Sequence, residues 1–393
     1  MTDTRNDSLN LNRLPMQLAG AGAVLLAVCA AAGFADRADF FRSYLVAYLF
    51  WIGITLGCLA VLMVQHLTGG QWALVIRRIL EAGTRTLPLM AVAAIPLLLG
   101  MHSLYSWSLP GQTDPVILGK QLYLNTNFFI VRMVIYFCVW FGLAYFLNKG
   151  SRTEDAEGAG LPLALRLEAI SGFGLVLYGF TVTFAGIDWV MSLEPRWYST
   201  IYGLLFMVGQ ALAAMAFSIA VLIWLSDSEP LSRSVQPAHY QDLGSFLLTF
   251  VMLWAYLEFS QFLIIWGGNL NSEIPWYLRR MQGTWGHVGL LLVVLNFALP
   301  FFLLLFRHVK RRKRSLLIVA GLVLLMRLVD MFWMVLPAFG GGNARLTWMN
   351  VALPLGFGGI WLAYFIWQLQ KAPILPVHDP RMEGVAQHAA GHG

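Results

Sequence analysis

The chain has 393 residues, of which 58% are hydrophobic, 14% aromatic and only 12% charged. Soluble domains carry about twice that share of charged residues, so the composition excludes an ordinary soluble protein and indicates a multi-pass membrane protein. The formal net charge is +6. Because the basic residues gather in loops, where they orient a membrane protein, this excess does not indicate a nucleic-acid partner.

Ten apolar runs are long enough to cross a bilayer, whose hydrocarbon core of roughly 30 Å needs about 20 helical residues. In chain order they are 15–34, 44–66, 86–104, 125–147, 163–191, 197–225, 242–266, 284–306, 315–338 and 347–370. The first run continues to the length of a full span, so we expect it to be retained rather than cleaved as a signal peptide. The predicted fold is all-α: a tail over 1–14, a ten-helix membrane domain over 15–370 and a tail over 371–393.

The segment 71–84 has apolar residues at helical spacing, with Arg77, Arg78 and Glu81 on the other side. This pattern is typical of an amphipathic helix that lies along the membrane surface. We therefore expect a surface helix here, with a protein-docking helix as the alternative.

Lys and Arg residues are distributed unequally between the two sides of the predicted bundle. The tails and even-numbered loops hold sixteen of them and the odd-numbered loops seven, and the run RHVKRRKR at 307–314 contributes most. Cytoplasmic loops carry this excess, so both termini are predicted to be cytoplasmic and the loops 105–124 and 267–283 periplasmic.

The hairpin FAGIDWVMSLEPRWYSTIYG joins two of the longest runs through a short polar turn. Asp188 lies one turn inside the membrane end of the first helix, and Trp189 and Trp197 form an aromatic belt at the same level. An acid at that depth is costly and indicates a functional site. A carboxylate facing the membrane interface is the alternative.

The other ionisable residues inside spans fall into two groups by depth. In the predicted periplasmic half lie His102, Arg132, Asp188, Glu258, His287 and Asp330, with Arg327 near the middle; in the cytoplasmic half lie His66, Glu168 and Asp242. Arg327 and Asp330 are three residues apart and can pair on one helix face. We expect Arg132, Asp188 and Asp330 to contribute to one polar cavity that serves as a proton path or quinol-site-like pocket, with Arg327 at its floor. A purely structural ion-pair network is the alternative.

No catalytic or metal site is predicted. The three cysteines, Cys29, Cys58 and Cys138, lie singly in apolar runs, without the spacing of a metal site, a c-type haem or a disulfide framework. His102 and His287 form the one histidine pair at similar depth that could ligate haem, although we expect each to be a hydrogen-bonding residue. A membrane transferase would need a nucleophile with an orienting base, and no such pairing is found locally.

Several longer motifs resemble a known family. They are IDWVMSLEPRWYSTIYG, GGQWALVIRRILEAGTRTLPLM, YLNTNFFIVR, FVMLWAYLEFSQFLIIWGGNL, MRLVDMFWMVLPAF and LPVHDPRMEG. Together they resemble the NrfD-like, polysulfide-reductase-type membrane subunits of bacterial alternative complex III, of the shorter ActF type, across nearly the whole chain. The resemblance implies two four-helix bundles plus two peripheral helices, in a complex of the bacterial inner membrane that oxidises quinol and passes electrons to cytochrome c or to an oxidase.

The resemblance also implies partners and cofactors. The partners would be a larger NrfD-like subunit with the better-supported quinol site, an iron–sulfur subunit and c-type cytochrome subunits, besides lipids. Haem c and iron–sulfur clusters would belong to those subunits, quinol would be a candidate ligand here, and this chain would not be catalytic alone. Arg132, Asp188, Arg327 and Asp330 fall within matching motifs. Glu258 stands where the family has a small or apolar residue, so it inherits no family role.

A secondary transporter is the alternative function. Such a protein would have a similar number of spans, broken helices and a substrate site near the midplane. The polar groups of this sequence instead favour the outer half of the membrane.

Overall fold

The computed structural model describes residues 13–158, 160–340 and 346–375. The predictions for the tails over 1–12 and 376–393 fall outside these ranges. All regular elements in the described ranges are helical, and singly or in consecutive groups they form ten stretches that are long and apolar enough to span a membrane. This confirms the predicted all-helical fold with ten candidate spans.

Six spans are single helices and four are composite. The single helices are α1 (Leu14–Gly33), α2 (Arg37–Thr68), α8 (Thr126–Glu157), α10 (Tyr202–Leu225), α12 (Pro237–Gly268) and α19 (Met349–Leu369). The composite spans are α3 (Arg77–Thr84) with α4 (Leu87–Ala93) and α5 (Ile95–Leu99); α9 (Leu161–Trp189) with η3 (Met191–Leu193); α14 (Gly283–Leu292) with η4 (Val293–Ala298) and α15 (Leu299–Leu305); and α17 (Lys313–Val335) with α18 (Pro337–Gly340). Short connecting helices are η1 (Gln71–Ala73), α6 (Met101–Leu104), η2 (Ser106–Ser108), α7 (Pro115–Gly119), α11 (Leu231–Ser234), α13 (Ile274–Met281) and α16 (Arg307–Arg311).

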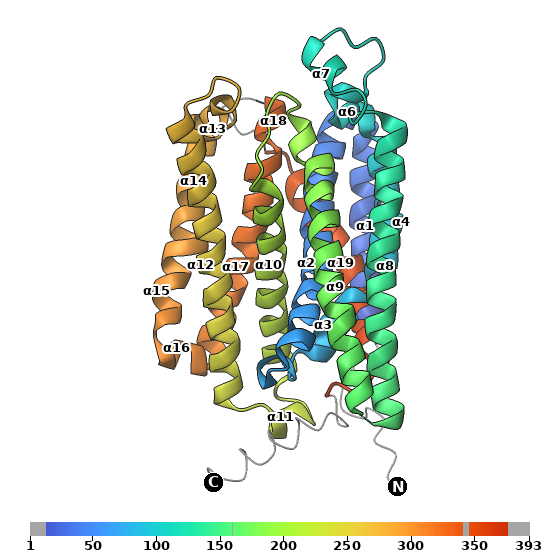
Figure 1. The fold of residues 1–393 in the computed structure, drawn as a ribbon, viewed down its shortest axis with the longest axis vertical. Coiled ribbons are helices and arrows are strands. Elements are labelled where there is room, and N and C mark those ends of the chain that lie inside the picture. The colour runs from blue at the N-terminus through green and yellow to red at the C-terminus, as the bar shows by residue number, and fades with distance from the viewer. Residues whose placement is uncertain (1–12, 159, 341–345, 376–393) are drawn as a thin grey trace.

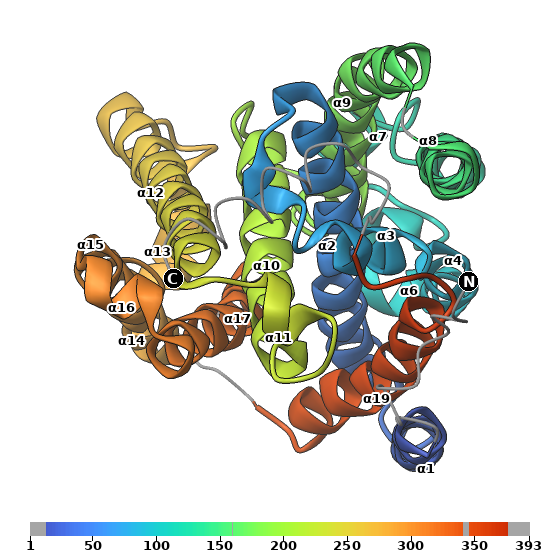
Figure 2. The same ribbon diagram turned by 90° about the horizontal axis from the view of Figure 1, so that it is seen from below.

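The helices α2 and α10 form the centre of the molecule, and they are the most deeply buried of the spans. They pack against each other, with α9 and α19 beside α2 and with α12 and α17 beside α10 (Figure 1). Their approach depends on a small residue: a Cβ on Gly57 would lie 2.1 Å from the carbonyl oxygen of Gln210. Small residues of this kind allow close backbone contact between helices in membranes. Figure 2 shows α1 at the edge, alongside α19.

Prolines interrupt several spans without ending them. The third span breaks between Ala93 and Ile95, just before Pro96, and the eighth contains a π-helical turn, η4, just before Pro300. Such interruptions free backbone groups that lipid cannot satisfy, so other helices must supply partners. Accordingly, the Tyr44 hydroxyl on α2 donates to the Ala93 carbonyl at 2.8 Å.

The predicted surface helix over 71–84 is wrong in its placement. Its helical part is α3, whose charged residues Arg77, Arg78 and Glu81 are at most 3% exposed. The reason lies in α8, which continues as a helix about ten residues beyond the predicted end at 147. This extension places carboxylates beside the arginines of α3, so the polar face of α3 meets protein rather than water.

Candidate functional site

A cavity of about 680 Å³ lies between α12, α13, α14 and α17. Most of its wall is apolar or aromatic, and its charged lining residues are Glu258, Arg280 and Asp330. Tyr256, Phe259, Leu290 and Val293 also line the cavity and are each more than half exposed on the outer surface. The cavity is therefore bordered by exposed apolar and aromatic side chains on the outer surface of the bundle. Its size is within the range of ligand pockets, and a few convergent polar groups on an apolar wall are typical of such sites.

Two carboxyl groups form the polar part of the inner wall. Asp330 on α17 pairs with Arg327 one turn earlier, through its Oδ2 atom. Within the described part of the chain, Asp330 Oδ1 and Glu258 Oε1 are buried and have no hydrogen-bond partner. A buried polar atom without a hydrogen bond costs free energy in an apolar setting. A ligand that donates a hydrogen bond to either oxygen, or a proton that binds it, would therefore be stabilised here.

Arg280 on α13 closes the end of the cavity. Its guanidinium donates to Glu194 Oε1 at 2.9 Å and to the Met334 carbonyl at 2.7 Å, and it lies 3.7 Å from the centroid of the Trp276 ring. Burial lowers the pKa of Arg280, whereas the carboxylate of Glu194 opposes this change by favouring the charged form. Arg280 therefore links α13 to Glu194, directly after η3, and to Met334, near the end of α17.

Arg132 and Asp188 form a separate ion pair between α8 and α9. Arg132 Nε and Nη2 each donate to one Asp188 oxygen at 2.8 Å, and the Tyr136 hydroxyl donates to Asp188 at 2.7 Å. The Arg132 guanidinium also stacks over Tyr123, 3.9 Å from the ring centroid. The pair is buried and its carboxylate is well satisfied.

The prediction of one cavity shared by Arg132, Asp188 and Asp330 is therefore wrong. Asp330 lines the cavity at α12 and α17, and neither residue of the α8–α9 pair does. Arg327 points instead into the packing between α2, α10 and α17. A Cβ on Gly209 would lie 2.1 Å from Arg327 Nη2, so that glycine provides the room for the guanidinium.

The remaining predicted residues lie apart from the cavity. His102 on α6 is exposed and 3.2 Å from Ser108 Oγ, and His287 on α14 is 3.2 Å from the Gly283 carbonyl. Figures 1 and 2 both place α6 and α14 on opposite sides of the bundle, so these two histidines cannot share a haem iron. On the other side of the membrane domain, Glu168 and Asp242 are exposed on α9 and α12, and His66 lies near the end of α2.

Sequence reasoning missed a buried charge network at that second end. Arg77 and Arg78 on α3 contact Glu81 in their own helix and, respectively, Glu154 and Asp155 in the extension of α8. The segment NKGSRTEDAE could have indicated this network, because Ser151, Glu154 and Asp155 are three and four residues apart and so lie on one face of a continued helix. Arg280 and Glu194 were missed too, because they were assigned to loops.

A comparison of the sequence with protein-family models finds no match, and a comparison with curated proteins finds none either. Functional inference therefore depends on the motifs and on the cavity.

Proposed function

We propose that this chain is an NrfD-like membrane subunit of a quinol-oxidising respiratory complex of the alternative complex III type, in the bacterial inner membrane. Its part in that complex would be to support assembly and to bind a quinone-type lipid in the cavity between α12, α13, α14 and α17, from which protons pass to Glu258 and Asp330. The cavity is the observation that carries the proposal, because it combines a border of exposed apolar and aromatic side chains with two unsatisfied carboxyl oxygens.

The helix contacts support the arrangement that the family resemblance implies. One group of four spans would contain α2, α3 to α5, α8 and α9, and the other α10, α12, α14 to α15 and α17. Contacts within each group connect all its members, and α2 and α10 join the two groups; α1 packs along α19, which in turn packs against α2. In this proposal the basic loops face the cytoplasm, and the cavity lies in the periplasmic half of the membrane.

The chemistry of a quinol suits this cavity. A quinol has an apolar ring that fits an aromatic wall, two hydroxyl groups that can donate to carboxylates, and a chain that remains in lipid. Its oxidation releases two protons and two electrons. Glu258 and Asp330 would accept the protons as general bases, and the electrons would pass to haem c and iron–sulfur groups on the partner subunits.

Filling the cavity tests this proposal. Ala255 lines it, so Ala255→Trp is expected to reduce labelling of α12 and α14 by a photoreactive quinone analogue about tenfold, since a blocked pocket loses most of its contacts with the ring. The assembled complex would be labelled in detergent and the modified peptides identified by mass spectrometry. Ala164→Trp, at an exposed position of α9 that does not line the cavity, is the matched control and should label normally. Labelling confined to partner subunits, or equal in both variants, would contradict quinone binding here.

One observation favours a secondary transporter as a second candidate. The π-helical turn η4 interrupts the eighth span, and both amide atoms of the buried Asn296 within it lack a hydrogen-bond partner among the described residues. Interrupted helices with unsatisfied polar groups are a feature of transporter sites. The two candidates differ in the partners expected on purification.

A further inference from the structure

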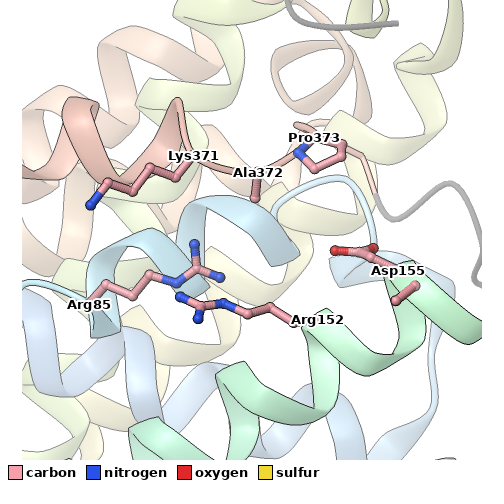
Figure 3. A pocket seen from close by; sticks show the side chains of 7 residues that line it. Arg85, Arg152, Asp155, Lys371, Ala372 and Pro373 are labelled. Carbon is pink, nitrogen blue, oxygen red and sulfur yellow. The ribbon is translucent and has the colours of Figure 1, made fainter. Parts of the chain in front are cut away.

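A second pocket, of about 450 Å³, is formed by other parts of the chain than the cavity between α12, α13, α14 and α17. Figure 3 shows it between the end of α3, the extension of α8 and the segment that follows α19. It is lined by Arg85, Arg152, Asp155, Ala156, Lys371, Ala372 and Pro373. Three basic side chains from three separate parts of the chain therefore meet around one space.

Arg85 is held in place at the base of this pocket. Its side chain is 10% exposed, its Nε donates to Asn148 Oδ1 at 2.7 Å, and its Nη2 lies 3.6 Å from Glu81 Oε2. Nη2 is buried and forms no hydrogen bond in the described part of the chain. A guanidinium whose Nε is held in this way can bind an anion through its accessible N–H groups with little loss of side-chain entropy.

The carboxylates nearby do not neutralise the pocket. Glu154 and Asp155 are engaged by Arg77 and Arg78, and Glu81 is shared among three arginines. No described residue forms an ion pair with Arg152 or Lys371. Desolvation, together with repulsion from Arg85 and Arg152, lowers the pKa of the exposed Lys371. An anion between these cations would relieve that repulsion.

The pocket lies at the boundary between lipid and water. The apolar helix α19 ends at Leu369, and the Lys371 ammonium lies 3.0 Å from the ring centroid of the half-exposed Trp367. Exposed tryptophan and lysine at a helix end are typical of the headgroup level. Ile374 and Leu375, next along the chain, are buried and fix the segment that forms the pocket wall.

We propose that this pocket binds the phosphate of an anionic phospholipid headgroup. Guanidinium groups bind phosphate oxygens through paired, charge-assisted hydrogen bonds. Basic pockets between transmembrane helices are suited to anionic lipids, and the apolar surface beside Trp367 would receive the acyl chains. Asp155 also lines the pocket, but its carboxylate is paired with Arg78 and so repels an incoming phosphate less.

The test is a lipid-binding measurement on the purified assembly that contains the full chain. After exchange into detergent, phosphatidylglycerol, phosphatidylcholine or inorganic phosphate would be added, and bound lipid measured by native mass spectrometry. Arg152→Gln and Lys371→Gln should each weaken phosphatidylglycerol binding about tenfold, and the double variant about a hundredfold, because each removes one charged contact. Both residues are exposed, so neither change should disturb folding. Lys149→Gln, at an exposed position of α8 outside the pocket, is the charge-matched control and should bind as the wild type does.

Three results would overturn the assignment. Equal loss in the Lys149→Gln control would show a general charge effect. Equal binding of phosphatidylcholine would show that the anionic charge is not recognised. Displacement of the lipid by inorganic phosphate at an equal concentration would assign the pocket to a soluble phosphate compound instead.

Discussion

Glu258→Gln is expected to lower quinol-driven proton release by the assembled complex about a hundredfold, the usual effect of removing a positioned general base. Glu258 is the more informative of the two cavity carboxyls because its carboxylate forms no ion pair in the described structure. The substitution therefore removes a proton acceptor while leaving every described ion pair intact. Proton release and quinol oxidation would be measured together, on complex reconstituted in liposomes.

Asp330→Asn should give a similar loss of activity together with a loss of stability. This change also removes the charge that pairs with Arg327, leaving a buried cation without its partner. The comparison separates the two roles of the cavity carboxyls. If Glu258→Gln assembles and turns over normally while Asp330→Asn fails to assemble, the charges form a structural network and the proton role is excluded. Glu273→Gln, outside the cavity lining, is the control and should retain wild-type activity.

Glu81→Gln is expected to destabilise the protein by about 3 to 5 kcal/mol, the usual cost of leaving a buried charge unpaired. Glu81 is 1% exposed, contacts Arg77, Arg78 and Arg85, and accepts a hydrogen bond from the Ser151 hydroxyl at 2.7 Å. With a neutral amide at this position, three guanidinium groups share only two carboxylates, those of Glu154 and Asp155, so one buried positive charge loses its partner. The network joins α3 to α8, so its loss should loosen that end of the domain.

The measurement is the temperature at which half of the detergent-purified protein remains monodisperse after heating. Asp227→Asn is the matched control, because it removes a carboxylate whose pair with Lys313 is exposed and should contribute under about 1 kcal/mol. A Glu81→Gln protein as stable as this control would show that the network adds nothing to folding.

The sequence predicted the ten spans well because their hydrophobic length is a local property. It also predicted the Arg327–Asp330 pair, which depends only on helical spacing. It misplaced α3, since an amphipathic pattern is the same whether its polar face meets water or the carboxylates of another helix. The extension of α8 that supplies Glu154 is polar, and a polar segment after a span is readily interpreted as a loop.

The candidate site was harder to predict because shared depth does not determine which helices are neighbours. Arg132 and Asp330 lie in the same predicted half of the membrane, yet one packs at α8 and α9 and the other at α12 and α17. Arg280 was counted as a loop cation, although its carbonyl and carboxylate partners come from segments far away in the sequence. Such contacts arise from tertiary packing, which hydrophobic periodicity does not encode.

Purification from native membranes is the most direct test of the proposed respiratory role. The chain would carry an affinity tag, be extracted in mild detergent, and be analysed by mass spectrometry and by a reduced-minus-oxidised absorption spectrum. We expect c-type cytochrome and iron–sulfur subunits to purify with it, with the haem spectrum lost when those subunits are removed. A chain that purifies alone, without redox partners or a haem spectrum, would contradict the respiratory role and favour the transporter.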